Sequence, residues 1–327
     1  MNRVVFFLLI AIFATGCGRQ GAPQPAKETP AAVAQPGAVP QAKAATLADA
    51  RRAHATKFAS NDGEKTPLPA PPAKLFRIVK FDSAVGKLSA YLTPDPKNGK
   101  KNPAIIWITG GDCNSIDEGC WNDGPPSNDQ SAGQYRKAGI VQMFPSLRGG
   151  NDNPGSKEAF YGEVNDVVSA LDFLAKQDFV DPTRIYLGGH STGGTLVLLV
   201  AESTDRFRAV FSFGPADDVR GYPAEYFPFD KNDLKEVNLR SPGRWLESVK
   251  GPTFVIEGMT QGNIASLNTM ASSTKNPNLH FLKVRGGDHF SILAPINRLI
   301  ATKILSDTGP TCSLTFTEQE LSKTLGR

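Results

Sequence analysis

Short apolar runs recur between residues 75 and 284 and alternate with stretches of helical periodicity. The run at 103–108 is continuously apolar, which is typical of a strand buried on both faces of a sheet, and residues 139–144 form another. Residues 164–174 instead place five aliphatic side chains on one helical face: Val164, Val167, Val168, Leu171 and Leu174. Further strands are expected at residues 75–81, 87–92, 185–188, 209–213, 253–256 and 279–284.

The order of these elements predicts an α/β fold. The first two strands are expected to pair antiparallel around a turn at residues 83–86. From residue 103 onward strands alternate with helical segments, which favours a mostly parallel, doubly wound sheet with helices on both faces. This domain is expected to span residues 74–327, because a single α/β domain often uses about 250 residues.

Residues 1–17 have the pattern of an export signal. A short positive segment at 1–3 precedes an apolar core at 4–13, which is too short to span a membrane as a mature helix. The small residues before Cys17 resemble the lipobox of bacterial lipoproteins. We therefore predict a signal peptide over residues 1–16 and lipid attachment at Cys17, which would anchor an exported protein at the periplasmic or outer-membrane face. The alternative is a secretory signal cut near Gly16 with Cys17 unmodified.

Residues 18–73 are rich in Ala, Pro, Gln and Gly and show little apolar patterning. Such a segment does not bury enough surface to fold. Residues 17–73 are therefore predicted to be the anchor cysteine followed by a disordered tether that carries no chemistry. A short helix at residues 47–55 is the one element expected within this tether.

The composition indicates a globular protein and excludes one class of partner. Hydrophobic residues make up 40% of the 327 residues and charged residues make up 21%. The net charge of +4 is small, and the sequence has no run of Lys or Arg and no basic stripe interleaved with aromatic residues. Binding to nucleic acid is therefore not expected.

Residues 184–194, RIYLGGHSTGG, carry the clearest indication of chemistry. An apolar run enters Ser191, which is flanked by Gly189 and Gly193, and the apolar segment 195–201 follows. This order is typical of a nucleophile elbow, a sharp strand-to-helix turn that exposes the serine hydroxyl at a helix N-terminus. The alternative is an ordinary turn with an inert serine.

The segments around this motif follow a known order. Five of them matter here: 160–174, 180–185, 240–242, 251–256 and 286–290. In sequence and spacing, residues 76–306 resemble the catalytic domain of the prolyl oligopeptidase family, within the α/β-hydrolase fold. The resemblance implies a serine hydrolase that acts on a peptide or an ester, and it implies no cofactor.

A serine nucleophile needs a neighbouring base, and the chain has 4 histidines. His54 lies in the predicted tether. His190 is unable to swing its ring onto the hydroxyl of the next residue, so we expect a packed turn residue, and His280 is expected in the core of a strand. His289 remains, in a glycine-containing loop after the last strand, where this fold places its base.

Three carboxylates compete to orient that base. The family usually has an aspartate three residues after the glycine that ends the preceding strand, and Gln261 occupies that position. Glu257, at the end of the same strand, is the preferred candidate. Asp217 and Asp218 follow the strand before it and are alternatives. A further alternative is that no carboxylate completes the triad.

The oxyanion hole requires two backbone N–H groups that point at the developing charge. Thr192, directly after the serine, is expected to supply one of them. Residues 109–112, Thr-Gly-Gly-Asp, resemble the glycine pair of the family, so Gly111 or Asp112 is expected to supply the other, with Gly111 preferred. The alternative is a glycine-rich turn without this role.

Assigning Cys17 to lipid leaves Cys113, Cys120 and Cys312. A disulfide between Cys113 and Cys120 is predicted, because the two are close in sequence and an oxidising compartment permits it. This bridge would staple the loop beside the oxyanion hole. A metal site of both cysteines with Asp117 is a weaker alternative because no histidine lies nearby, and no metal is predicted. Cys312 is expected to be free or buried.

Residues 214–246 carry an aromatic set: Tyr222, Tyr226, Phe227, Phe229 and Trp245. In this fold the region often forms a small lid, so the set is expected to line an apolar acyl pocket, with packing of the lid as the alternative. Residues 148–155 resemble the Arg-Gly-Ser segment of the family but depart from it at Gly150 and Asp152, which leaves peptide recognition open.

The combined prediction is an exported, lipid-anchored serine hydrolase whose substrate is a small-molecule ester or a short peptide. Its partners would be that substrate and, through the lipid, a membrane. The alternative, which Gln261 motivates, is a catalytically silent hydrolase fold that binds at the cell envelope.

Overall fold

The computed structural model describes residues 46–59, 65–223 and 227–326. All of them belong to one compact unit that runs from Ala44 to Arg327. The predicted signal peptide, the lipid site Cys17 and much of the predicted tether lie outside the described residues.

The centre of this unit is an eight-stranded sheet with the order β1-β2-β4-β3-β5-β6-β7-β8. Its strands are β1 (Arg77–Ser83), β2 (Gly86–Leu92), β3 (Asn102–Ile108), β4 (Val141–Pro145), β5 (Val180–His190), β6 (Val210–Phe213), β7 (Thr253–Gly258) and β8 (Leu279–Val284). β2 pairs antiparallel with β1 and with β4, and all other neighbours are parallel. The mostly parallel sheet with an antiparallel opening pair is confirmed.

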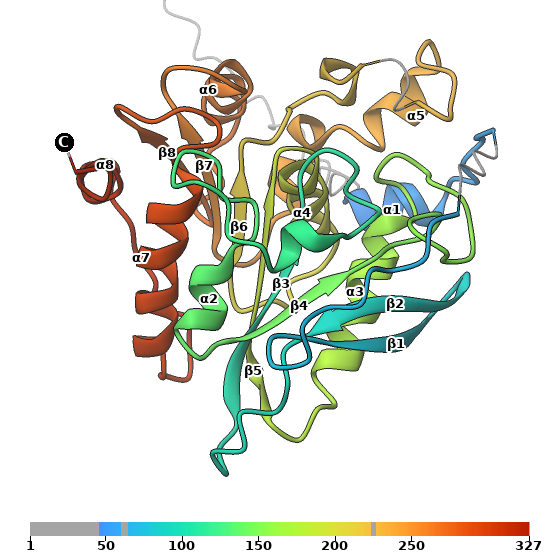
Figure 1. The fold of residues 1–327 in the computed structure, drawn as a ribbon. Helices are drawn as coiled ribbons and strands as arrows, with labels where there is room; N and C mark the ends of the chain where they lie inside the picture. The colour runs from blue at the N-terminus through green and yellow to red at the C-terminus, as the bar shows by residue number, and fades with distance from the viewer. Residues whose placement is uncertain (1–45, 60–64, 224–226, 327) are drawn as a thin grey trace, which may run out of the picture. The chain divides into compact units, whose positions relative to one another are not determined.

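Helices cover both faces of this sheet, as Figure 1 shows. Side chains of α1 (Leu47–Arg52), α3 (Glu163–Leu174), α4 (Thr192–Ser203), α5 (Leu234–Asn238) and α6 (Ile264–Ser273) enter the core on one face. Side chains of α2 (Gly133–Lys137), α7 (Leu293–Ser306) and α8 (Glu318–Lys323) enter the core on the other. Short 3-10 turns lie in the loops: η1 (Glu118–Cys120), η2 (Val219–Gly221), η4 (Pro242–Arg244) and η5 (Leu246–Ser248).

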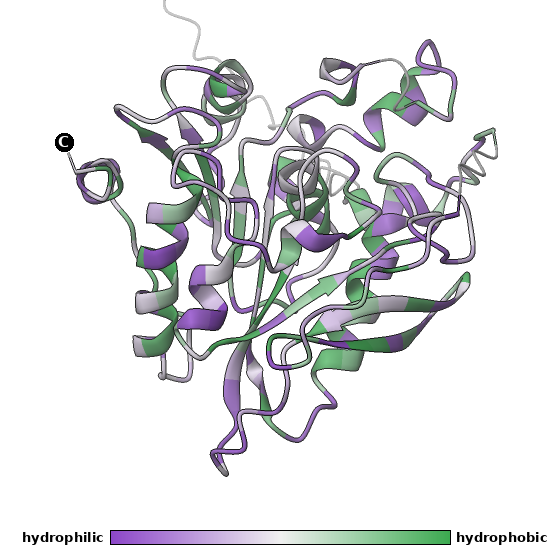
Figure 2. Cartoon of the chain, in the orientation of Figure 1, coloured by the Kyte–Doolittle hydropathy of each residue, from purple (hydrophilic) through white to green (hydrophobic). Residues whose placement is uncertain are grey.

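The apolar runs became strands because helices bury both faces of the sheet. All seven residues of β3 are buried, as its continuous apolar run predicts. Alternate side chains of that strand enter opposite cores, for example Ile105 on the α7 side and Ile106 on the α3 side. Figure 2 shows the resulting pattern, with hydrophobic strands between helices that carry hydrophilic residues as well.

Residues 46–59, called the N-terminal strap from here on, fold against the domain instead of forming the predicted tether. α1 begins with a capping box, and Leu47 is fully buried. The guanidinium of Arg51 donates to backbone carbonyls of residues 160–161 and of Leu239 at 2.7–3.1 Å. The composition did not indicate this docking, because it depends on a helix cap and on two side chains, Leu47 and Arg51. The strap has no extended apolar pattern.

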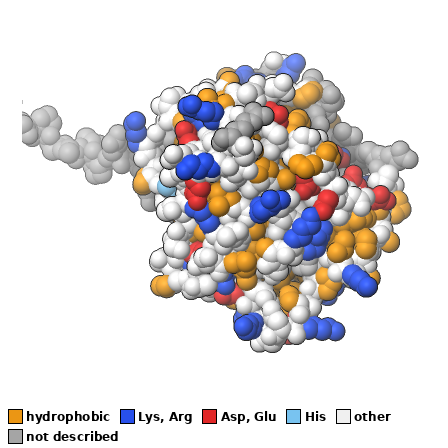
Figure 3. All heavy atoms as spheres, turned by 60° about the vertical axis from the view of Figure 1, so that its left-hand side comes forward, with side chains coloured by type: hydrophobic (Ala, Val, Ile, Leu, Met, Phe, Trp, Pro, Cys, Tyr) orange, Lys and Arg blue, Asp and Glu red, His pale blue; other side chains and the backbone are white. Residues whose placement is uncertain are grey.

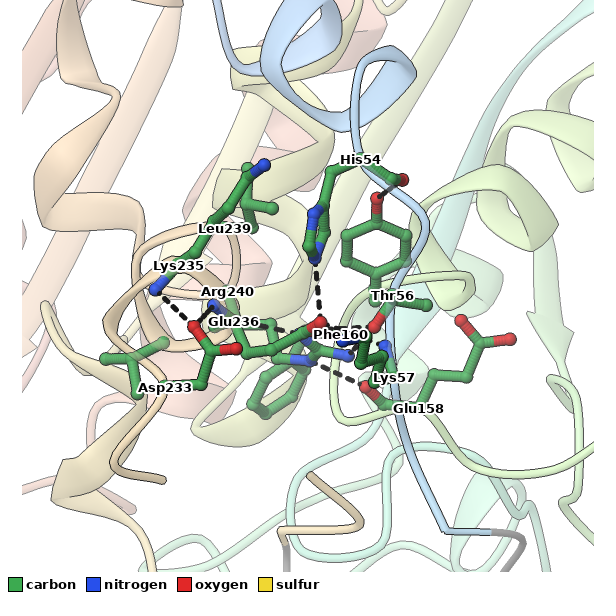
Figure 4. A network of polar contacts seen from close by, with 12 residues as sticks. His54, Thr56, Lys57, Glu158, Phe160, Asp233, Lys235, Glu236, Leu239 and Arg240 are labelled. Atoms are coloured by element: carbon green, nitrogen blue, oxygen red, sulfur yellow. Dashed lines mark hydrogen bonds and ion pairs between the residues drawn. The ribbon is translucent and has the colours of Figure 1, made fainter. Parts of the chain in front are cut away.

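The strap closes onto Glu236 of α5, as Figure 4 shows. His54 Nε2 lies 2.7 Å from Glu236 Oε1, the Thr56 hydroxyl donates to Oε2 at 2.7 Å, and the Lys57 N–H donates to Oε1 at 2.9 Å. Arg240, which is fully buried, pairs with Glu236 and donates to the Thr56 hydroxyl at 2.8 Å. The folded unit therefore includes the strap and starts before the predicted boundary at residue 74.

The predicted disulfide is absent from the structure. Cys113 and Cys120 are both free, and each is buried. Cys113 packs in the core on the α3 side of the sheet, whereas Cys120 packs on the α7 side, so proximity in sequence does not bring the two sulfurs together. Burial raises the pKa of both thiols, which makes them small apolar core residues.

The aromatic set predicted to line an acyl pocket packs into the core. Phe229 is buried, and Tyr222, Phe227 and Trp245 pack against the cluster on the α3 side. The Tyr222 hydroxyl lies 2.6 Å from Thr195 Oγ1 in α4. Tyr226 lies outside the described residues. The packing alternative therefore accounts for the described members of the set.

One face of the surface carries charges of both signs. Acidic and basic side chains lie close to one another on the face shown in Figure 3, among apolar and other polar side chains. None of the helices in residues 46–59, 65–223 and 227–326 combines the length and the apolar character needed to cross a membrane.

Candidate active site

Ser191 lies in the turn between β5 and α4. Its φ of 58° and ψ of −115° are rare for a residue with a side chain and cost on the order of 1–3 kcal/mol. The Ser191 N–H donates to Phe213 O at 2.8 Å, which ties the turn to the end of β6. A Cβ on Gly193 would lie 2.5 Å from Thr109 O, so only glycine fits there. The segment is therefore a strand, a strained turn and a helix, as the sequence motif predicts.

Glu257 is the carboxylate that contacts His289. Its Oε2 lies 2.8 Å from His289 Nδ1, and both side chains are buried. The backbone N–H of Gly258 donates to Oε1 at 2.7 Å, and that of Asn263 donates to Oε2 at 2.9 Å. The carboxylate is thus held rigidly, and it accepts from the Nδ1 side of the ring, which leaves Nε2 for another partner.

Gly214, which the sequence analysis did not single out, makes room for this pair. It follows β6 with a φ of +57°. A Cβ there would lie 2.6 Å from His289 Nδ1 and 2.7 Å from Glu257 Oε2. Ser191 follows β5, Glu257 lies in β7 and His289 follows β8, so the carboxyl ends of these parallel strands bring the three residues to one edge of the sheet, around Gly214 at the end of β6. A glycine directly after a buried strand was the available signal.

The alternative carboxylates have other partners. Asp217 Oδ1 accepts a hydrogen bond of 2.7 Å from the Ser266 hydroxyl. Asp218 caps η2 and pairs with Arg220 at 2.7 Å, and this hydrogen bond lowers the pKa of Asp218. Gln261, the residue at the family position, is exposed. Glu257 is therefore the candidate acid that the geometry favours.

His190 makes two polar contacts that sequence reasoning missed. Its ring is 1% exposed, with Nε2 3.0 Å from the carbonyl oxygen of His289 and Nδ1 3.0 Å from Gln130 Oε1. The His190 and His289 ring centroids are 4.4 Å apart. Burial, together with the neighbouring His289, lowers the pKa of His190 to about 3. The expected packed turn residue thus also contacts the backbone of His289.

The other two histidines have contacts elsewhere. His280 stacks on Phe254, with 4.9 Å between the ring centroids, and this partial burial of the ring lowers its pKa. Its main-chain position within β8 is as expected, although its side chain is exposed rather than enclosed in the core. His54 belongs to the N-terminal strap and contacts Glu236.

The loop after β3 lies against the start of α4. The Thr192 hydroxyl donates to Gly111 O at 2.8 Å, which joins the two predicted oxyanion-hole residues. Thr192 is the first residue of α4, so its N–H has no partner within the helix. A Cβ on Gly110 would lie 3.3 Å from Ser191 Cβ. The structure therefore brings Gly111, Thr192 and Ser191 together.

A buried charged cluster supports this loop from behind. Arg148 pairs with Asp166 at 2.8 Å and with Glu158. Although burial opposes it, hydrogen bonding and charge from Asp166 and Glu158 raise the pKa of Arg148. Asn114 Nδ2 donates to Arg148 O at 2.8 Å and to Glu163 Oε1 at 3.0 Å. The segment that resembles Arg-Gly-Ser therefore fixes the loop after β3.

A cavity of about 670 Å³ adjoins the serine. Most of its lining comes from the loop after β3, and Gln130, His190, Ser191 and Phe290 complete it. Phe290 is 41% exposed, so it presents an apolar surface at this cavity. A cavity of this size suits a small substrate.

Two comparisons with known proteins agree with this geometry. Residues 127–275 match the prolyl oligopeptidase family. Among solved structures, a puromycin-hydrolysing peptidase of Mycobacterium tuberculosis is similar, with a TM-score of 0.57, 18% identity, and coverage of 73% of this chain and 40% of the other. Dipeptidyl peptidase 4 of Porphyromonas gingivalis has a TM-score of 0.55 and 16% identity, covering 71% of this chain and 35% of the other.

A smaller protein is matched over most of its length. An esterase of Pyrobaculum calidifontis has a TM-score of 0.53 and 17% identity, covering 72% of this chain and 86% of the other. This chain thus spans less than half of the first two structures and most of the esterase's length. At these identities the structural likeness establishes the α/β-hydrolase fold. Residues 127–275 are the part of that fold that matches the prolyl oligopeptidase family.

Proposed function

We propose that this chain is a serine hydrolase that cleaves a small ester or a short peptide through an acyl-enzyme on Ser191. The observation that carries the proposal is the strained turn at Ser191, whose N–H is bonded to the residue before Gly214. Gly214 in turn lies against the buried His289, whose Nδ1 is 2.8 Å from Glu257 Oε2. Strain of this kind persists where the surroundings impose it, and nucleophiles are among the residues that benefit. The family match supports the same class of reaction.

In the proposed reaction, His289 Nε2 takes the proton of the Ser191 hydroxyl while Oγ forms a bond to the substrate carbonyl carbon. Glu257 accepts the Nδ1–H, which fixes the tautomer and stabilises the imidazolium. The N–H groups of Thr192 and Gly111 receive the charge on the carbonyl oxygen. The bond to the leaving alcohol or amine then breaks, and that group takes the proton from His289.

Water completes the cycle in the second half-reaction. His289 takes a proton from water, whose oxygen attacks the acyl carbon of the ester on Ser191. The second tetrahedral intermediate collapses, the acid product leaves, and the serine regains its proton. No other reactant is needed for this balance.

The proposal is tested by labelling with a fluorophosphonate probe, which reacts with activated serines. The protein should begin at or before Ala44, because a start at residue 74 would remove the strap. We expect labelling of the wild type and none of Ser191→Ala. A well-folded wild type that stays unlabelled would contradict the proposal and favour the binding protein instead.

We also propose that the protein is exported and held at the membrane by a lipid on Cys17. Support comes from the sequence of residues 1–17, which combines a positive start, a short apolar core and small residues before the cysteine. Expression of the full chain in a bacterium fed radiolabelled palmitate tests this idea. We expect label in the wild type and none in Cys17→Ala, and equal labelling of both would refute lipidation at this cysteine.

A further inference from the structure

His190 lies where three parts of the candidate site meet. It is the last residue of β5, directly before Ser191. Its Nε2 approaches the backbone oxygen of His289 at 3.0 Å, and its Nδ1 approaches the Gln130 side chain at 3.0 Å. A Cβ on Gly110 would lie 3.0 Å from Nδ1, so the oxyanion loop rests against the same ring.

The chemistry of these partners fixes the form of the His190 ring. A carbonyl oxygen only accepts hydrogen bonds, so Nε2 carries a hydrogen and donates to His289 O. A ring buried this deeply beside a second imidazole is neutral, which leaves Nδ1 as an acceptor. Nδ1 faces Gln130 Oε1 as placed, and two acceptors do not bond, so the Gln130 amide is to be turned over, which puts its NH2 group against that nitrogen as the donor.

The loop after β8, which carries His289, is held in place by a few hydrogen bonds. It begins with Gly286 at a φ of +80° and reaches α7 within a few residues. Thr260 binds the carbonyl of Gly287 through its backbone N–H at 3.2 Å and its hydroxyl at 2.8 Å. These bonds fix the loop to the end of β7, whereas the serine is carried by β5. The His190 bond connects the base directly to the strand that carries the nucleophile.

We propose that His190 is a positioning residue of the hydrolase, whose Nε2–H holds the backbone of His289 at a fixed distance from Ser191. The inference rests on the proposed function. A general base works within hydrogen-bond reach of its proton, and a displacement of about 1 Å costs on the order of 10²-fold in rate. Loss of this donor should therefore slow the attack step more than it weakens substrate binding.

The test compares His190→Gln with His190→Met in the chain from Ala44. Both side chains are unbranched and of similar length, but only glutamine has an amide donor that reaches the position of Nε2. For each variant we would measure the second-order rate of fluorophosphonate labelling, kcat and KM with a p-nitrophenyl ester, and the thermal unfolding midpoint. Methionine is apolar and suits a buried position, so this variant is expected to fold.

We expect His190→Met to label and turn over about 10–100-fold more slowly than wild type, with KM changed by about twofold at most. His190→Gln should stay within about threefold of wild type. Equal rates for the two folded variants, at any level, would overturn the inference, because the ring would then act only by filling space. An unreactive wild type would instead overturn the proposed function, and this inference with it.

Discussion

The molecule contains two histidine–glutamate pairs of nearly the same length, one at the candidate site and one in the strap. His289 lies 2.8 Å from Glu257, and His54 lies 2.7 Å from Glu236. The side chains are 10% and 0% exposed in the first pair and 11% and 1% in the second. Distance and burial therefore do not distinguish a candidate catalytic pair from a structural one.

The other partners of the two carboxylates do distinguish them. Glu236 pairs with the guanidinium of Arg240, so its charge is already balanced by a permanent cation. Glu257 accepts from two backbone N–H groups, and no Lys or Arg among the described residues forms an ion pair with it. Its negative charge is thus left to stabilise an imidazolium. The fixed cation marks the structural pair, and the neighbouring strained serine marks the other.

The most direct test of this difference removes the charge of each carboxylate in turn. Glu257→Gln should lower kcat on the order of 10⁴-fold, because an amide no longer selects the tautomer or stabilises the charged ring. Glu236→Gln is the matched control and should leave kcat per folded molecule within about twofold of wild type. Ester hydrolysis with active sites counted by fluorophosphonate measures both. A Glu257→Gln variant as active as wild type would remove Glu257 from the triad.

The second prediction concerns stability, for which Glu236 should matter more than Glu257. Glu236→Gln should lower the free energy of unfolding by about 3 kcal/mol, because it leaves the buried Arg240 without its carboxylate. Glu257→Gln should cost less, because its carboxylate balances no permanent cation. Urea unfolding at neutral pH compares the two. A larger loss in Glu257→Gln would contradict the assignment of the strap pair as the structural one.

The same pair predicts an acid-sensitive strap. Burial opposes ionisation of Glu236, but hydrogen bonds from the Lys57 N–H, Thr56, His54 and Arg240 lower its pKa to about 2. Since the folded pKa lies below the unfolded value, this stabilisation is present above about pH 4.5 and is lost as the pH falls toward 2. Unfolding measured between pH 6 and pH 2 should show this loss in the wild type and a smaller one in Glu236→Gln.

The contrast between the regions also shows what sequence predicts. The sheet, the turn at Ser191 and the loop at His289 were predictable because each depends on a local pattern of apolar runs, glycines and a motif. The strap was not, because Leu47 and Arg51 dock through partners more than a hundred residues away. The Cys113–Cys120 bridge was wrongly predicted for a related reason: the chain between the two cysteines passes from one face of the sheet to the other.

A further prediction concerns the candidate catalytic pair alone. Gly214→Ala should lower kcat on the order of 10²-fold, because its Cβ would displace both His289 and Glu257 from positions 2.6–2.7 Å away. Gly251→Ala is the control, since its Cβ would meet nothing nearer than Phe207 O at 3.9 Å. Equal kcat for these two variants would show that His289 and Glu257 tolerate displacement. The statement that the Glu257 carboxylate is held rigidly would then be wrong.

The smallest expected effect comes from a carboxylate that has neither kind of partner. Glu202, at the end of α4, is 2% exposed, and neither of its oxygens has a hydrogen-bond partner among the described residues. Burial raises the pKa of Glu202 well above its usual range, with the charge of Arg51 opposing the shift. The folded pKa exceeds the unfolded one, so the protonated carboxyl is tolerated below about pH 4.5. The stability of the folded state then falls as the pH rises from there through the folded pKa.

Glu202→Gln should therefore match wild type in unfolding free energy at pH 4 and exceed it at pH 8, where burial of the wild-type carboxyl costs stability. Urea unfolding at the two pH values measures the difference, and an equal effect at both would show that folding does not raise the pKa of Glu202. The expected outcome completes the comparison: a buried glutamate next to a cation stabilises the strap, and one without a partner costs stability. The glutamate that faces only N–H groups and a histidine is the one we propose for catalysis.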